Sequence, residues 1–371
     1  MSFEITHITS AHTRTDVRIF VKMCKSLVEN GYRVNLLVCD GLGDSVRDGV
    51  NILDCFTPKG RFNRIFIAPL FLFFKAISFK SHIFHLHDPE LFFIGLALKS
   101  CGKKVIFDSH EDFPEQILSK HYLNPIVKNL LSFMSKFLEK FVCSQLSGVI
   151  SSTPFINHKF KSYGIRSVNV CNFPILSEFE TEKKITRSVN TLCYVGDISK
   201  LRGAVEMVKA LEVSRSNVNL NLCGKFIDSE SEPICKSLSG WNKVAYKGVI
   251  DRSSIRQELS ESTVGLVLLH PTNCYKVSYP IKMFEYMAVG LPVIVSDFPL
   301  WRQIIEGNKC GVCVNPLDPN AIANAIDFFL ENPDIARCMG ENGRTLVHNK
   351  FDWNTQFFKL VMFYSYIMKC T

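Results

Sequence analysis

The sequence lacks a long apolar run, which every membrane-spanning helix requires. Its most hydrophobic stretch, residues 65–74, is about half the length needed to cross a bilayer, and it ends at Lys75. The N-terminus, Met-Ser-Phe-Glu, has neither a basic start nor an apolar core, so we expect no secretory signal. These absences predict a cytoplasmic protein.

The signatures of three ligand classes are also missing. No Asp-x-Asp pair occurs, so we expect no metal ion and no other cofactor in the chemistry. No Gly-x-Gly-x-x-Gly is present, and Gly41-Leu-Gly43 is only a fragment of that dinucleotide-binding pattern. No dense run of Lys and Arg with interleaved aromatic residues appears, so nucleic acid is not a predicted partner.

Cysteine is plentiful, but its pattern excludes a disulfide framework. The 14 cysteines are scattered through apolar stretches such as Leu192-Cys193-Tyr194, where a thiol behaves as a small hydrophobic group. The one Cys-x-x-Cys, Cys310 to Cys313, has no second pair or histidine nearby, so neither zinc binding nor redox chemistry is predicted. The pattern fits a reducing cytosol.

The alternation of short apolar runs with amphipathic helical segments is what the sequence does contain. In 371 residues, a length that favours two domains, this alternation is typical of parallel sheets wound with helices. We therefore predict an α/β protein with two Rossmann-like, doubly wound domains facing a central cleft. The expected parts are an N-terminal acceptor-binding domain (1–176), a linker (177–190), a C-terminal nucleotide-sugar-binding domain (191–352) and a helix crossing back to the first domain (353–371).

The expected strands fall into two series. The first comprises 4–9, 33–39, 82–87, 104–108, 148–152 and 168–171, with helices at 17–30 and 125–145 between them. The second comprises 191–195, 217–223, 244–246, 264–269, 292–296 and 311–315.

The strongest local motif runs from Ser278 to Asp297. Pro280 suits a helix start and Gly290 a helix end, and between them Lys282 and Glu285 share one face of the helix. The pair has two interpretations. It is either a surface ion pair or part of a donor site, in which the helix start binds a diphosphate and the carboxylate accepts ribose hydroxyls.

Pro280-x-Lys282-x-x-Glu285-Tyr-Met-Ala-x-Gly290-x-Pro-Val-Ile resembles the donor-site signature of the family-4 retaining glycosyltransferases, which have a two-domain type B fold. The resemblance covers nearly the whole chain. Its N-terminal part comprises His7-Ile-Thr-Ser10, Asp16-x-Arg18-Ile-Phe20, His87-Asp-Pro-Glu-Leu91 and Asp108-Ser-His110-Glu111.

The resemblance implies a donor site in the C-terminal half. There Glu285 would hold the ribose, and Arg202, directly before Gly203, would stabilise charge on the leaving diphosphate. The alternative for Arg202 is an ordinary arginine at a helix start. The remaining donor-binding residues implied are Gly196, Lys200, Gly203, Lys225, Ser278 and Lys282.

Two positions depart from the family pattern. Asp197 replaces a common basic residue, and Val277 replaces the first glutamate of a paired-glutamate motif. We interpret these differences as altered donor handling.

On the N-terminal side the resemblance places His110 beside the transferred sugar, so the expected catalytic residues are Arg202, His110 and Glu285. Ser10, His12, His87 and Asp88 are the expected acceptor-side residues. For Asp88 we favour a simpler role, capping the helix that begins near Pro89.

Two segments combine basic and aromatic residues, 59–80 and 125–140. Such helices suit the headgroup zone of an anionic membrane, and the net charge of +8 adds attraction. The alternative is that both are core-facing helices with solvated lysines. By resemblance we favour peripheral association with the inner face of the cytoplasmic membrane.

The predicted function is retaining, metal-independent hexosyl transfer. A UDP-sugar is the favoured donor and a GDP-sugar a possible one. The expected acceptor is a lipid-linked glycan in bacterial cell-surface polysaccharide biosynthesis, such as lipopolysaccharide O-antigen. The alternatives are a non-catalytic sugar-nucleotide-binding subunit of the same fold and a sugar-nucleotide epimerase.

Overall fold

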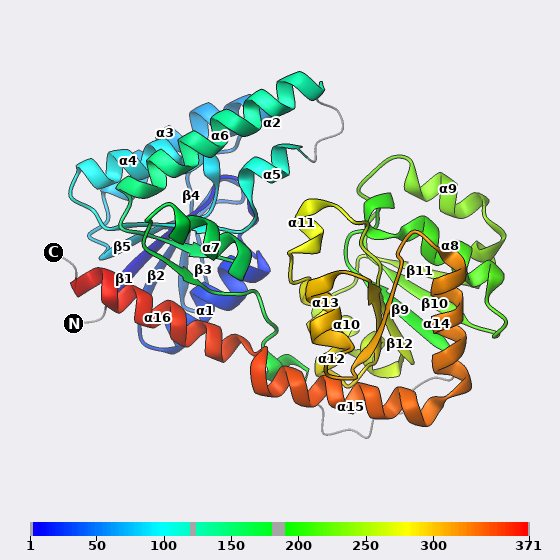
Figure 1. Ribbon diagram of the computed structural model, residues 1–371. Helices are drawn as coiled ribbons and strands as arrows, with labels where there is room; N and C mark the ends of the chain where they lie inside the picture. The colour runs from blue at the N-terminus through cyan, green and yellow to red at the C-terminus, as the bar shows by residue number, and fades with distance from the viewer. Residues whose placement is uncertain (1–2, 119–123, 180–189, 370–371) are drawn as a thin grey trace. The chain divides into compact units, whose positions relative to one another are not determined.

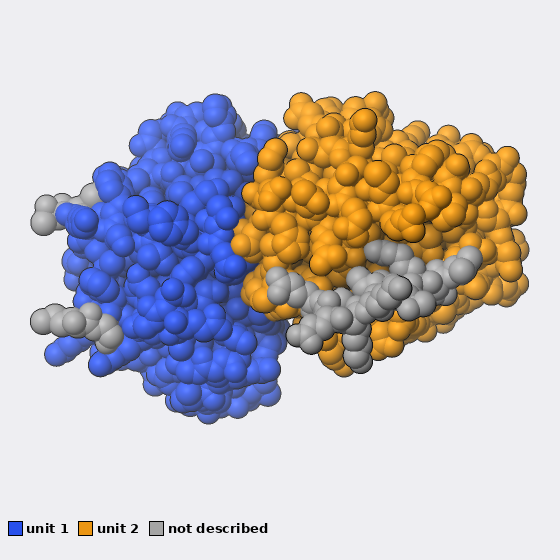
Figure 2. Space-filling model, turned by 90° about the horizontal axis from the view of Figure 1, so that it is seen from below, with its two compact units in different colours: residues 1–172, 353–371 blue, residues 173–352 orange. Residues whose placement is uncertain are grey.

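A computed structural model describes residues 3–118, 124–179 and 190–369 of the chain. The chain forms two compact units, residues 1–172 with 353–371, and residues 173–352, which are coloured separately in Figure 2. The first unit is therefore discontinuous in sequence.

The first unit is built on an eight-stranded sheet in the order β3-β4-β2-β1-β5-β6-β7-β8. Every pairing in it is parallel except that of β3 with β4. The order reverses between β1 and β5, and ligands of doubly wound sheets bind beyond the strand ends at such a point. The strands are β1 (Glu4–Ile8), β2 (Arg33–Val38), β3 (Ser45–Arg47), β4 (Val50–Asp54), β5 (Ile83–Leu86), β6 (Val105–Ser109), β7 (Gly148–Ser151) and β8 (Ser167–Asn169).

Helices cover both faces of this sheet. In Figure 1, α3, α4 and α6 lie on one side of it and α16 on the other. The helices are η1 (Val17–Cys24, π-helical), α1 (Lys25–Glu29), α2 (Gly60–Phe62), η2 (Asn63–Ile67), α3 (Ala68–Ile77), η3 (Pro89–Leu91), α4 (Phe92–Ser100), α5 (Phe113–Leu118), α6 (Pro125–Gln145), α7 (Pro154–Ser162) and α16 (Trp353–Lys369). The helix expected at 125–145 is confirmed at those bounds, and the C-terminal helix expected within 353–371 spans Trp353–Lys369.

The second unit contains a six-stranded parallel sheet in the order β11-β10-β9-β12-β13-β14. Numbered along this unit, that is the Rossmann order 3-2-1-4-5-6, with its reversal between β9 and β12. The strands are β9 (Thr191–Val195), β10 (Asn219–Cys223), β11 (Val244–Gly248), β12 (Val264–Val267), β13 (Val293–Ser296) and β14 (Gly311–Val314).

The core of the second unit lies between this sheet and its helices. Helices α8 and α14 pack on one face through a cluster that includes Leu220, Leu266 and Ile326. The helices are η4 (Leu176–Glu178), η5 (Lys200–Arg202), α8 (Ala204–Val213), α9 (Ser231–Ser237), η6 (Ser239–Lys243), α10 (Arg252–Glu261), α11 (Asn273–Lys276), α12 (Ile281–Ala288), α13 (Pro299–Ile305), α14 (Pro319–Glu331) and α15 (Pro333–Lys350).

The sequence prediction missed the hairpin of β3 and β4. Its turn is Asp48-Gly49, and both residues have positive φ, 48° and 77°. An Asp-Gly pair between strands is the usual signal of such a turn, because its two central positions need left-handed backbone. The sequence therefore contained the signal for this hairpin.

The boundary between the units differs slightly from the predicted one. The first unit ends at Asn172, whereas we expected 176, and helix α16 belongs to this unit. Of the expected linker 177–190, residues 180–189 lie outside the described residues.

The cysteines of the described chain are free thiols, most of them buried. Burial raises the pKa of Cys310 to about 11 and that of Cys313 to about 12, so both stay protonated near neutrality. Within the same part of the chain, no helix is both long and apolar enough to span a bilayer.

Candidate functional site

In the second unit, the loop from β9 to α8 requires glycine at two positions. Gly196 directly follows this strand with φ 123°, and a side-chain Cβ there would come within 2.9 Å of Lys282 Nζ. Gly203 precedes α8 with φ 75°, and a Cβ there would lie 2.2 Å from the carbonyl oxygen of Leu268. Only glycine fits both positions.

Lys282, in the first turn of α12, points into this place. Its Nζ lies 3.7 Å from the ring centroid of Tyr194. The Nζ is buried and has no hydrogen-bond partner among the described residues. A buried, unpaired ammonium is costly, so this nitrogen is suited to an anionic ligand.

The pKa of Lys282 lies well below its usual value. Burial is the largest cause, and the positive charge of Arg202 is the second. Burial and the charge of Arg202 both disfavour the ammonium, so Lys282 loses its proton more readily in the free protein than an exposed lysine does. A bound anion would raise the pKa of Lys282 again, because negative charge favours the ammonium.

Arg202 lies beside the same tyrosine. Its side chain is half-buried, and its Nη2 is 3.3 Å from Asp197 Oδ2. Tyr194 Oη donates to the carbonyl oxygen of Asp197 at 2.6 Å. Asp197, the first departure from the family pattern, therefore partly neutralises Arg202.

Glu285 is buried rather than part of a surface pair with Lys282. Its Oε1 accepts a hydrogen bond from Arg252 Nη1 at 2.8 Å. Arg252 also pairs with Glu178 and lies over the ring of Phe179, 5.6 Å from its centroid. The carboxylate expected to hold the ribose is thus already held by an arginine.

The other expected donor residues are more peripheral. Lys200 and Lys225 are exposed, although Lys225 lies near the loop because its carbonyl accepts from Ile198 N–H at 2.9 Å. Ser278 Oγ donates to the carbonyl of Tyr275 at 3.0 Å, and this bond holds the turn before α12.

In the first unit Asp88 ties down the loop after β1. The prediction that Asp88 caps the following helix is wrong, since its side chain accepts no bond from that helix. Its Oδ2 instead accepts from Thr9 Oγ1 and Ser10 N–H, both at 2.7 Å. Asp88 therefore fixes Ser10 by joining the ends of two neighbouring strands.

His12 lies in the same loop between two carboxylates. Its Nδ1 is 3.2 Å from Asp16 and its Nε2 is 3.4 Å from Asp88. Burial opposes charge on the ring, but the bond to Asp16 and the charge of Asp88 outweigh it and raise the pKa of His12.

His110 and His87 meet at a buried carboxylate after β6. His110 Nε2 lies 3.1 Å and His87 Nδ1 3.4 Å from Asp108 Oδ2. Arg18 binds the same carboxylate through two nitrogens, at 2.9 and 2.7 Å. Burial lowers the pKa of His87 to about 4, so its ring is neutral.

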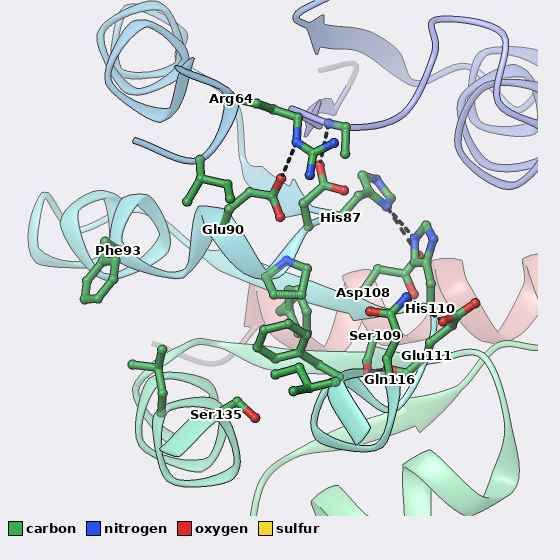
Figure 3. A pocket seen from close by; sticks show the side chains of 18 of the residues that line it. Arg64, His87, Glu90, Phe93, Asp108, Ser109, His110, Glu111, Gln116 and Ser135 are labelled. Atoms are coloured by element: carbon green, nitrogen blue, oxygen red, sulfur yellow. Dashed lines mark hydrogen bonds and ion pairs between the residues drawn. The ribbon is translucent and has the colours of Figure 1, made fainter. Parts of the chain in front are cut away.

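A cavity of about 940 Å³ opens above these groups. Its lining combines polar side chains, including His12, Asp88, Glu90 and His110, with apolar ones, including Ile65, Phe93 and Met134. Figure 3 shows His87, Asp108 and His110 gathered at one end and Phe93 far from them. The cavity therefore suits a ligand with a hydroxyl-rich part and an apolar part.

Two groups of side chains in the described chain have ligand atoms close enough for a metal ion. They are His7 with His85 and His87, and His87 with Asp108 and His110. Several of these atoms already bind one another, including His7 Nδ1 to His87 Nε2 at 2.9 Å.

Sequence reasoning missed two positioning groups. Arg18 was part of a motif, but its pairing with Asp108 joins residues 90 positions apart, which no local pattern reveals. Arg252 carried no motif, and only the fold brings it to Glu285.

Both halves of the chain match known protein families. Residues 177–346 match the family model "Glycosyl transferases group 1", and residues 17–172 match "Glycosyltransferase Family 4".

Similar sequences are glycosyltransferases. An uncharacterized glycosyltransferase of Methanocaldococcus jannaschii is 24% identical over 296 residues, 74% of this chain and 73% of that protein. The capsular polysaccharide biosynthesis glycosyltransferase CapM of Staphylococcus aureus is 23% identical over 265 residues, 66% of this chain and 68% of that protein.

Solved structures share the fold. Sucrose-phosphate synthase from Thermosynechococcus elongatus superposes with a TM-score of 0.80 at 18% identity, over 100% of both chains. Anabaena HepE in complex with UDP-glucose has a TM-score of 0.75 at 14% identity, over 98% of this chain and 99% of that one.

Proposed function

The chain belongs to the group 1, family-4 glycosyltransferases, and from this membership we propose that it transfers a hexosyl unit, with retention of configuration, from a nucleotide diphosphate donor to a lipid-linked glycan. The buried Lys282 Nζ, which has no hydrogen-bond partner in the described part of the chain, carries the donor part of the proposal. It lies where the strand order reverses, beside Arg202, and this is where a doubly wound sheet binds a nucleotide.

In this proposal Lys282 and Arg202 neutralise the diphosphate, so no metal ion is needed in the transfer step. Their positive charges stabilise the negative charge that develops as the sugar–phosphate bond breaks. Glu285 accepts the ribose hydroxyls and exchanges part of its bond to Arg252 for them. A UDP-sugar is the favoured donor, since HepE, which has the same fold, binds UDP-glucose.

The cavity of the first unit supports the acceptor part. Its polar lining offers His12, Asp88 and His110 to sugar hydroxyls, and its apolar lining includes exposed side chains of η2, α4 and α6. A lipid-linked glycan has both kinds of surface. The similarity to a capsular polysaccharide enzyme favours cell-surface polysaccharide as the product.

Peripheral membrane association belongs to the same proposal. Large apolar side chains are exposed on α2, η2, α3 and α6, such as Phe66 (59%), Phe74 (69%) and Phe137 (59%). Lys and Arg residues lie among them, as helices on an anionic surface require.

The test is transfer from a panel of nucleotide sugars to a lipid-linked acceptor, in the presence and absence of a chelator. We expect product with retained configuration and unchanged rates in chelator. Arg202→Ala and Glu285→Ala should each lower kcat roughly 100-fold, while Lys225→Ala, at an exposed position, should have a much smaller effect. Binding of nucleotide without any turnover would favour a non-catalytic subunit, and a product epimerised at the nucleotide-sugar level would indicate an epimerase.

A further inference from the structure

Asp108 is the best-fixed charged group near the cavity. The carboxylate is fully buried, and Arg18, itself 5% exposed, binds both of its oxygens. A third bond, from Arg18 Nη1 to the carbonyl of Val170 at 3.0 Å, holds the guanidinium in place. Asp108 Oδ2 therefore has a defined position from which to act on its neighbours.

This position determines which nitrogen of His110 carries the proton. Nε2 lies 3.1 Å from Asp108 Oδ2, and an ionised carboxylate oxygen can only accept hydrogen bonds. If Nε2 were unprotonated, its lone pair would face the lone pairs of the carboxylate oxygen and be repelled by them. Nε2 must therefore carry hydrogen, and in the neutral ring Nδ1 is the unprotonated nitrogen.

The neighbouring rings agree with this assignment. His110 Nε2 lies 3.1 Å from His87 Nδ1 as well as 3.1 Å from Asp108 Oδ2, so a hydrogen on Nε2 can be shared by these two acceptors. The neutral His87 ring then carries its hydrogen on Nε2, which donates to His7 Nδ1 at 2.9 Å. Of the three histidines, only His110 lines the cavity with an appreciably exposed side chain, 18%.

We propose that Asp108 is a positioning residue that holds His110 as the Nε2–H tautomer, so that Nδ1 accepts a hydrogen bond from a sugar hydroxyl in the cavity. The role of His110 in this inference rests on the proposed transfer reaction, whereas the assignment of its tautomer does not. A substrate hydroxyl would then donate to His110, and an ether at that position could not.

The geometry is tested by NMR of the full chain labelled with ¹⁵N at histidine. Nε2 couples to both ring C–H protons and Nδ1 to only one, so the two tautomers give different cross-peak patterns. The His110 signals are assigned by their loss in His110→Gln. We expect the proton on Nε2 in the wild type and on Nδ1 in Asp108→Asn, because the amide N–H of Asn can donate to Nε2.

The role is tested by kinetics on the same variants. Asp108→Asn should lower kcat roughly 100-fold, the scale of a misplaced proton-transfer or hydrogen-bonding group. UDP affinity should stay unchanged, since the donor residues belong to the other unit. Asp327→Asn is the matched control, because Asp327 is also buried and bound to an arginine but lies in the second unit.

Asp108→Asn leaves Arg18 without its partner and can fail to fold. The double variant Arg18→Gln with Asp108→Asn removes both buried charges, so it replaces the single variant in that case. A wild-type spectrum with hydrogen on Nδ1, a metal ion bound stoichiometrically to these side chains, or unchanged kcat in the folded variant would each overturn the proposal. If the wild type transfers no sugar, the proposed function fails, and the spectrum alone still decides the tautomer.

Discussion

The protonation of Lys282 should depend on whether an anionic ligand is bound beside it. Its nitrogen is buried against Tyr194 and near Arg202, an environment that favours the neutral amine. A diphosphate would add negative charge at the same place, and opposite charge favours the ammonium. Ligand binding and proton binding at Lys282 should therefore be coupled.

The first prediction is that UDP binding takes up protons. The pKa of free Lys282 is depressed, so above that pKa the amine is neutral, and bound diphosphate raises the pKa and draws in a proton. Calorimetry at several pH values, from neutral to alkaline, in buffers of different ionisation enthalpy should show net uptake in part of this range, and Lys282→Met should abolish it. Equal binding enthalpies in all buffers for the wild type would contradict this reasoning.

The second prediction concerns His12, whose pKa is raised, whereas that of Lys282 is lowered. The pKa of His12 is raised in the folded state, so this ring stabilises the fold below its unfolded pKa of about 6.5. That contribution is lost as the pH rises through the folded value. His12→Gln should therefore reduce the free energy of unfolding more at pH 5.5 than at pH 8.5. His348→Gln, at an exposed position, should show no such difference.

At the scale of elements, the loop from β9 to α8 depends on its glycines. Gly203 has φ 75°, and an added Cβ would meet the Leu268 carbonyl. Gly203→Ala should cost roughly 1–3 kcal/mol of unfolding free energy, measured by urea titration. Gly248→Ala, with φ 63° and open space around it, is the control and should cost less. Equal losses would mean that the close contact is unimportant.

Helix α6 provides the test of membrane association. Phe133 and Phe137 are 60% and 59% exposed, with ring centroids 4.7 Å apart. Replacing both by Asp should reduce binding to anionic vesicles at least roughly 10-fold. Burial of each phenylalanine ring in the membrane would contribute about 1.5–3 kcal/mol of binding free energy. Phe358→Asp on α16, at a 65% exposed position, should change little. If the double variant of Phe133 and Phe137 binds like the wild type, α6 is not the docking surface.

Elements were easier to predict from the sequence than the contacts between them. Buried parallel strands give continuous apolar runs such as Thr191–Val195, and Pro with Gly brackets α12, so both were recognisable locally. The donor residues could be named because they lie within one motif. The pairs Arg18 with Asp108 and Arg252 with Glu285 join distant positions, and the role of Asp88 depended on the loop of another strand.

At the scale of the whole molecule, the second unit is an insertion into the first. Lys22 Nζ donates to Asn172 Oδ1 at 2.6 Å and lies 6.0 Å from the Trp353 ring centroid, so the exit and return points of the chain are neighbours. Trp353 is buried, with its Nε1 donating to Ser26 Oγ at 2.9 Å, and Tyr364 bonds His85 at 2.6 Å. The first unit therefore needs α16.

This arrangement predicts the behaviour of fragments. Residues 1–172 alone should fail to fold cooperatively, because removal of α16 exposes the face that it covers. The same fragment joined to 353–371 by a short Gly/Ser linker should fold, as measured by circular dichroism during thermal unfolding. Residues 173–352 should fold alone and bind UDP. Cooperative unfolding of 1–172 by itself would show that α16 is dispensable.

The burial of most thiols has a practical consequence. Among the described residues, only Cys101 and Cys338 are exposed, and one belongs to each unit. A maleimide dye should react with these two faster than with the buried thiols, whose pKa values are raised. In a chain with Cys370 replaced by serine, Cys101 and Cys338 would therefore provide a donor–acceptor pair for fluorescence energy transfer, with one dye on each unit.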